Sequence, residues 1–147
     1  MKFLFDANVP KKAQSAVRTV FTGHQFVAVW EPPFDPDMDD LALFELAKSE
    51  KIDAVITHDV VQMVGLDRRH ERGRCADCGL HWLGMPQPYK VHGPLRKSAH
   101  IASGLIHALA DVIDVFEAAS APTAILLSEV SSKPGFERGY PQLVDSG

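Results

Sequence analysis

Three aspartates in the first part of the chain have the type and position to form a metal site. Asp6 follows a short apolar run, Asp40 stands in the first turn of an expected helix, and Asp59 follows a second apolar run. Carboxylate oxygens are the ligands that Mg²⁺ and Mn²⁺ prefer, together with water and phosphate. Such a cluster can activate water and stabilise a phosphoryl transition state. Each aspartate alone is equally explained as a turn residue, a cap or a dipole partner, so the prediction depends on their convergence.

The strands expected before Asp6 and Asp59 would bring these side chains together. Short runs rich in β-forming residues predict strands at residues 3–5, 25–30 and 52–57. Parallel strands joined by helices place their carboxyl ends along one edge of the sheet, where ligands of α/β proteins gather. We therefore expect an α/β protein with three α/β/α layers and a parallel sheet.

Two helices are predicted between these strands. Asn8 is a suitable N-cap for the first, with Pro10 in its first turn and apolar residues at helical spacing up to Val20. The second should begin near Met38, with Asp37 as its N-cap.

The rest of the chain is expected to complete one domain over residues 1–130. Residues 60–66 suit a short helix, whereas the glycine- and proline-rich residues 67–94 suggest an irregular insertion. A long apolar stripe from residue 95 to 116 predicts a helix, and residues 123–127 predict a last strand. Residues 131–147 are rich in Ser, Gly and Pro and are expected to form a flexible tail.

Composition limits the classes of function. The 147 residues carry a formal net charge of −4, so no overall positive field favours nucleic acid, although a local basic patch could. We find no signal-peptide pattern and no apolar run that approaches a membrane span. The two cysteines do not suit a secreted disulfide framework. We therefore expect a cytoplasmic protein with no membrane association, and a homo-oligomer.

The order of these segments resembles the PIN-domain superfamily. The matching stretches are FLFDANVP, GHQFVAV, DLALFELA and IDAVITHD, within residues 1–62. The chain looks closest to compact PIN-like members among prokaryotic toxin ribonucleases. This resemblance implies a Mg²⁺- or Mn²⁺-dependent ribonuclease, the toxin of a toxin–antitoxin pair, with RNA as substrate and an antitoxin protein as partner. It implies that Asp6, Asp40 and Asp59 hold the metal, and that Thr57 is the hydroxyl preceding the last acid.

The chain also departs from the family pattern. Fuller PIN nucleases carry another acid between the first acid and the helix acid, and nothing here matches it clearly. Val61 and Gln62 stand where compact members have Asp and Phe. A second function therefore stays open, namely a PIN-like binding module for protein or RNA without nuclease activity.

Two further groups of residues could do chemistry. His70, Cys75, Cys78 and His81 are of the types that form a tetrahedral Zn²⁺ site, although a single Cys-x-x-Cys pair is equally explained by a loop with two reduced thiols. The best local basic patch for an RNA backbone consists of the arginines at 68, 69, 72 and 74 with Arg96 and Lys97, although most such runs are only solvated surface. The substrate-binding candidates are Asn8, Thr57, Arg68, Arg69, Arg96 and Lys97.

Overall fold

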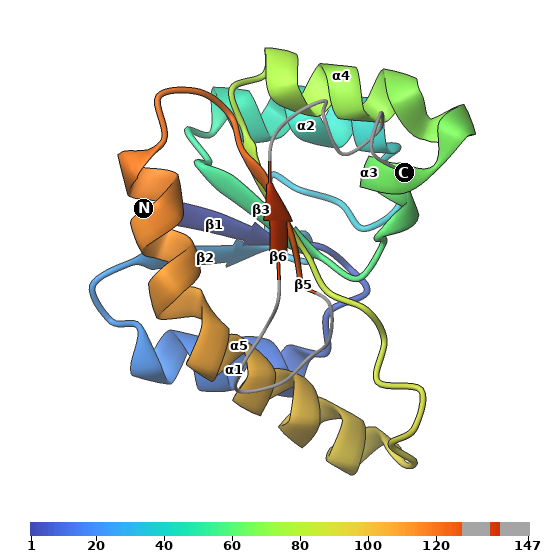
Figure 1. Ribbon diagram of the computed structural model, residues 1–147, viewed down its shortest axis with the longest axis vertical. Coiled ribbons are helices and arrows are strands. Elements are labelled where there is room, and N and C mark those ends of the chain that lie inside the picture. The colour runs from blue at the N-terminus through green and yellow to red at the C-terminus, as the bar shows by residue number, and fades with distance from the viewer. Residues whose placement is uncertain (128–135, 139–147) are drawn as a thin grey trace.

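The computed structural model describes residues 1–127 and 136–138 and shows helices on both faces of one six-stranded sheet (Figure 1). The elements in chain order are β1 (Lys2–Phe5), α1 (Lys11–Val20), β2 (Gln25–Ala28), α2 (Asp40–Ser49), β3 (Ala54–Thr57), α3 (Val61–Val64), the 3₁₀ turn η1 (Leu66–Arg68), α4 (Arg69–Asp77), β4 (His81–Gly84), α5 (Pro94–Ala118), β5 (Ala124–Leu127) and β6 (Phe136–Arg138). The predicted three-layer α/β/α fold is confirmed.

The sheet places the ends of its strands where a site can form. Its strand order is β2-β1-β3-β4-β5-β6, and the first five strands are parallel, while β6 pairs with β5 in the antiparallel direction. The central strand β3 lies between β1 and β4. The carboxyl ends of β1 to β5 therefore share one edge of the sheet, as the alternation of strands and helices predicted.

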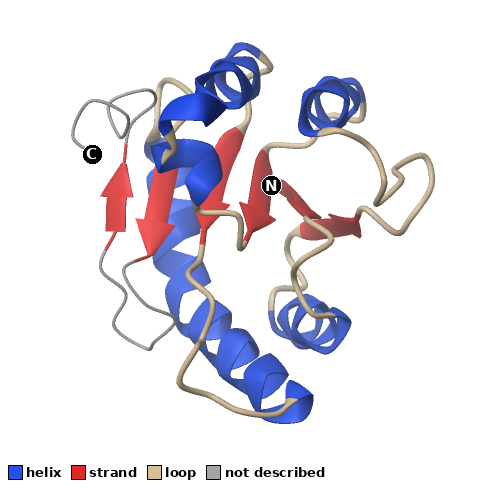
Figure 2. Cartoon of the chain, turned by 90° about the vertical axis from the view of Figure 1, so that its right-hand side faces the viewer, coloured by secondary structure: helices blue, strands red, loops and turns tan. Residues whose placement is uncertain are grey.

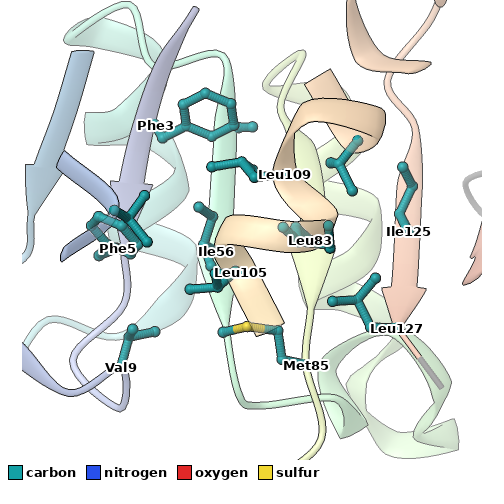
Figure 3. Packing of buried hydrophobic residues seen from close by; sticks show 14 of the residues in the cluster. Phe3, Phe5, Val9, Ile56, Leu83, Met85, Leu105, Leu109, Ile125 and Leu127 are labelled. Atoms are coloured by element: carbon teal, nitrogen blue, oxygen red, sulfur yellow. The ribbon is translucent and has the colours of Figure 1, made fainter. Parts of the chain in front are cut away.

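Alternate strand residues build two separate cores. On one face, Phe3 and Phe5 of β1 pack with residues of α1 and α5, and on the other face Leu4 packs with residues of α2 and α4. Figure 3 shows Leu105 and Leu109 of α5 lying against the strand residues of the first core. Strands buried on both faces are typical of parallel sheets, which explains their continuous apolar runs.

The long helix α5 covers the sheet face that α1 also covers (Figure 2). The predicted apolar stripe is buried over most of its length, but Leu95 and Ala99 at its start are exposed. His100 and His107 are exposed on the other side of the helix. By length and composition alone, α5 is also the one helix of the described residues that could cross a membrane, so our statement that no apolar run approaches a span was wrong. The core helix of a soluble protein passes the same test, and half of the relevant stretch is buried.

The prediction of an irregular insertion at residues 67–94 is wrong for most of its length. It contains α4 and the interior strand β4, whose Trp82 and Leu83 are completely buried. The strand was missed because HWLG has only two consecutive apolar residues and lies in a segment rich in Gly and Pro, and the helix because its sequence RHERGRCAD has no apolar stripe. Within this segment, residues 78–80 between α4 and β4 and residues 85–93 between β4 and α5 lie outside the helices and strands.

Smaller differences concern the helix starts and the chain end. The residue flanking α1 is Pro10 rather than Asn8, and the N-cap of α2 is Asp39 rather than Asp37, because the Asp39 carboxylate accepts a hydrogen bond from the Ala42 N–H at 2.9 Å. The short helix expected at residues 60–66 is present as α3 over Val61–Val64, and residue 66 already belongs to η1. The predicted tail, residues 131–147, lies outside the described residues except for β6, where a strand replaces the expected flexible chain.

Candidate functional site

Asp6 and Thr57 join the ends of β1 and β3. The Thr57 hydroxyl donates to Asp6 Oδ2 at 2.7 Å, and the Ala7 N–H donates to Asp6 Oδ1 at 2.8 Å. The Thr57 Oγ1 in turn accepts from the Asp59 N–H at 3.0 Å. Both oxygens of Asp6 are therefore held in place, and the orienting hydroxyl also fixes the backbone of the second acid.

Asn8 strengthens this connection instead of capping α1. Its amide Nδ2 donates to Thr57 Oγ1 at 3.2 Å, and its Oδ1 accepts from the His58 N–H at 3.0 Å. The predicted capping role was wrong because the side chain turns toward β3. Asn8 thus ties the loop after β1 to the turn after β3, and its role is positional.

Asp40 and Asp59 are joined by Arg68. The Arg68 Nη2 lies 2.7 Å from Asp59 Oδ2 and 3.3 Å from Asp40 Oδ2, and 2.9 Å from Glu71 Oε1, while Arg68 Nε contacts Glu71 Oε2. These four side chains, which we call the arginine clamp, come from the turn after β3, from α2, from η1 and from α4. Arg68 was predicted to contact RNA phosphate, whereas its guanidinium here is directed at carboxylates.

The three predicted aspartates share one electrostatic environment. Burial raises the pKa of the Asp6 carboxyl above its usual value, the hydrogen bonds from Thr57 and Ala7 oppose the shift, and the negative charges of Asp40 and Asp59 add to it. Such an effect of Asp40 and Asp59 requires them to be near Asp6. The structure therefore brings together acids that three separate segments of the chain supply.

His58 is fixed beside these acids by the backbone of the next strand. His58 is buried, with 6% of the residue exposed, and its Nδ1 lies 3.0 Å from the carbonyl oxygen of Met85, the residue after β4. Burial lowers the pKa of this imidazole, against opposing contributions from the carbonyl groups and Asp6. The ring is therefore neutral at neutral pH, and it holds the turn after β3 against β4. Our sequence prediction missed this residue.

The carboxylate oxygens of the three aspartates are of the kind that suits Mg²⁺ or Mn²⁺. Two of these aspartates, Asp40 and Asp59, are however bound to the guanidinium of Arg68. Among residues 1–127 and 136–138, no group of three or more His, Cys, Asp or Glu side chains is close enough to hold a metal ion. A metal bound by all three aspartates would therefore require the arginine clamp to open. The donor chemistry fits the predicted metal, and the clamp is what such a metal would have to displace.

The predicted zinc ligands do not come together in the described part of the chain. Cys75 and Cys78 are buried in the core that α2 and α4 form with Leu4 on one face of the sheet, and neither forms a disulfide. His81 lies on the opposite face of the sheet, where its ring stacks on Phe116 at 4.6 Å and its Nδ1 accepts from the Thr123 N–H at 3.0 Å. His70 is exposed on α4. The Cys-x-x-Cys spacing here serves the packing of α4 instead.

The predicted basic patch is divided in the structure. Arg72 is buried and donates to the carbonyl oxygens of Gln62 and Gly65, and Arg74 pairs with Glu45 at 2.8 Å. Arg69, Arg96 and Lys97 are exposed, the last two in the first turn of α5. These three remain candidates for contacts with RNA.

Comparison of the chain with protein-family models, with curated proteins and with solved structures finds no match in any of the three. The resemblance to PIN domains therefore stays a prediction that is based on the motifs of residues 1–62.

Proposed function

We propose that the protein is a metal-dependent ribonuclease whose reaction takes place at the edge formed by Asp6, Asp40 and Asp59. The observation that carries this proposal is the orientation of Asp6 by Thr57, at a point where the charges of Asp40 and Asp59 also act. Several like charges gathered at one edge of a sheet are costly unless a cation or a reaction uses them.

The charge balance of this edge supports the same conclusion. Asp6, Asp40, Asp59 and Glu71 carry four negative charges when ionised, and the described contacts supply one positive charge, on Arg68. Three negative charges thus lack a partner within this set. A divalent ion would compensate most of them, and Asp6, Asp40 and Asp59 are the residues that would hold it.

The protein residues prepare the site in a definite way. Each Asp6 oxygen accepts one hydrogen bond, which fixes the carboxylate plane and leaves further lone pairs directed elsewhere. Asn8 and Thr57 hold the two strand ends at a constant separation. A bound Mg²⁺ or Mn²⁺ would activate water and stabilise the charge that develops on phosphate.

The proposal predicts that purified protein cleaves single-stranded RNA in Mn²⁺ or Mg²⁺ and loses this activity in chelator. We expect Asp6→Asn to lower the cleavage rate by about 100-fold or more, because an amide is a poorer ligand for a hard cation than a carboxylate. Rates are measured on a labelled oligonucleotide, with circular dichroism to verify the fold. Val20→Ala, at the exposed end of α1, is the control and should cleave like the parent. Equal cleavage by Asp6→Asn would identify a contaminating nuclease.

The arginine clamp favours a second function, that of a PIN-like binding module without catalysis. Because Arg68 already bonds Asp40 and Asp59, these acids could serve to fix η1 and α4 rather than to hold metal. In that case Mn²⁺ would neither bind the folded protein nor support cleavage. Isothermal titration of the parent with MnCl₂ separates the two functions.

A further inference from the structure

An exposed tryptophan lies beside the start of α1, close to the candidate site. Trp30 is 39% exposed, whereas Trp82, the second tryptophan of the chain, is completely buried. The Lys11 Nζ lies 4.6 Å from the centroid of the Trp30 ring. A partly exposed tryptophan ring with the ammonium group of an exposed lysine over it combines an aromatic surface with a positive charge.

The register of the sheet places Trp30 near Asp6. Ala28, the last residue of β2, pairs with Phe5 of β1, and the Val29 N–H donates to the Phe5 carbonyl oxygen at 3.2 Å. Asp6 directly follows Phe5, and Trp30 comes two residues after Ala28. Since neighbouring strands are about 5 Å apart, the two residues leave the sheet at adjacent places. The Trp30 ring lies on the α1 side of the edge, as its contact with Lys11 shows.

An open groove runs between Trp30 and α1. Lys11, Arg18, Trp30 and Glu31 line it, together with small and polar residues of α1 and β2. Arg18 Nη2 pairs with Glu31 Oε1 at 2.5 Å, so the one acid of this lining is compensated. The groove thus offers an aromatic face and the positive charge of Lys11, in a chain whose overall charge is negative.

We propose that this groove, the Trp30 groove, binds single-stranded RNA next to the acidic edge, with a base stacked on Trp30 and a phosphate on Lys11. Aromatic stacking and a nearby cation are the two features of single-strand recognition, and a base-paired strand has no free base face to offer. This inference rests on the proposed function, because RNA is chosen over other aromatic ligands by the position of the groove beside that edge. A protein partner is the alternative occupant.

The test uses binding alone, so that it does not depend on cleavage. The full chain carrying Asp6→Asn is titrated in chelator with an eight-residue oligouridylate, and tryptophan fluorescence is recorded. Trp82 is buried with its indole N–H bonded to Gln62 Oε1 at 2.9 Å, so quenching by the oligonucleotide reports on Trp30. We expect saturable quenching and a measurable Kd.

Three variants and one control in the same background define the contact. Trp30→Leu should raise the Kd about tenfold, while Trp30→Phe should restore most of the affinity, because phenylalanine keeps a stacking face. These Kd values are measured by anisotropy of a labelled oligouridylate, since the variants lack the reporter. Lys11→Gln should lower the slope of log Kd against log salt by about 0.7. Val20→Ala, which changes an exposed apolar residue at the other end of α1, should have no effect.

The outcomes separate the groove from the reaction. If oligouridylate does not bind, or if Trp30→Leu binds it as tightly as the parent background, the Trp30 groove is not an RNA site, and a protein partner becomes the explanation for Trp30. If binding depends on Trp30 and Lys11 but the parent never cleaves RNA in Mn²⁺, the groove stands and the nuclease proposal fails. An abasic oligomer of the same length should bind with a Kd that no longer depends on Trp30 but still depends on Lys11.

Discussion

The acidic edge and the Cys-x-x-Cys segment were both predicted as metal sites, and the fold gives their residues different surroundings. The edge brings Asp6, Asp40 and Asp59 into one electrostatic environment although they are far apart in sequence. The segment keeps Cys75 and Cys78 three residues apart, yet both are buried in the core below α2.

The difference shows what each kind of sequence signal measures. The positions of Asp6 and Asp59 were predicted from topology, because any residue after a parallel strand must lie at the carboxyl edge. The cysteines were predicted from local spacing, which is compatible with a metal site but also with one face of a helix. Cysteine behaves as a small apolar residue when it is buried, and this property explains the position of Cys75 and Cys78 in the core.

The largest effect on stability should come from removing the cation of the arginine clamp. We expect Arg68→Met to lower the free energy of unfolding by about 2–3 kcal/mol in chelator, because it leaves neighbouring carboxylates unpaired. The loss is smaller than for a fully buried pair, because the Arg68 side chain is 26% exposed. Mn²⁺ should stabilise this variant more than the parent, since the ion then meets no competing guanidinium. Urea titrations in chelator and in Mn²⁺ measure both effects.

Arg74→Met is the matched control for this prediction. Arg74 also pairs with a glutamate from another helix, but both partners are largely exposed, so its loss should change stability by less than about 1 kcal/mol. If the two arginine variants have the same free energy of unfolding, the arginine clamp is only a surface ion pair, and the acidic edge does not depend on Arg68.

A smaller effect is expected in the cysteine segment. Cys75→Ser should lower the free energy of unfolding by about 1–2 kcal/mol, because a hydroxyl is more costly than a thiol to bury in this core. Zn²⁺ and chelator should give the parent the same melting temperature in freshly reduced protein. A zinc-dependent increase that Cys75→Ser abolishes would restore the metal site and contradict the packing role.

These residues also show how far the sequence could predict the fold. Elements with strong apolar patterns, such as α5 and the strands β1 and β3, were predicted correctly because burial determines both the pattern and the structure. The helix α4 could not be recognised, since its buried residues include Glu71 and Arg72, which in a sequence look solvated. Its packing depends on partners that periodicity does not reveal.

The candidate site was predictable in part. Asp6 and Asp59 followed from strand ends, Asp40 from the first turn of a predicted helix, and Thr57 from the resemblance to PIN domains. The role of Arg68 did not follow, because a basic residue near a nuclease-like motif is naturally assigned to phosphate. The spacing of Arg68 and Glu71, three residues apart, was the available signal for an ion pair on one side of a helix. Glu71 was missed because this spacing was not recognised as an ion pair.

The smallest predicted effect concerns the pH dependence of Asp6. Since the pKa of Asp6 is raised in the folded protein, the folded state binds the proton more tightly than the unfolded chain, and ionisation of Asp6 removes stability as pH rises through the folded pKa. Asp6→Asn removes this dependence. The stability of Asp6→Asn relative to the parent should therefore increase from acidic to neutral pH, by less than about 1 kcal/mol. Denaturant titrations at several pH values in chelator measure this difference, and a constant difference would show that Asp6 ionises without cost.

The central claim is that the acids of the edge act together on one cation, and neighbouring residues allow a controlled test. Asp39 caps α2 through the Ala42 N–H, while Asp40 faces Arg68. Asp39→Asn and Asp40→Asn thus remove the same charge at adjacent positions, and asparagine keeps the capping ability of the first.

The deciding measurement is the thermal melt of the parent, Asp39→Asn and Asp40→Asn, each in chelator and in saturating Mn²⁺. A metal present at about 100 times its Kd stabilises the folded state by about 2.7 kcal/mol. We predict a Mn²⁺-dependent increase in Tm that is equal in the parent and in Asp39→Asn and is largely lost in Asp40→Asn. The same increase in Asp40→Asn as in the parent, or no increase in any of the three proteins, would contradict a shared cation at this edge.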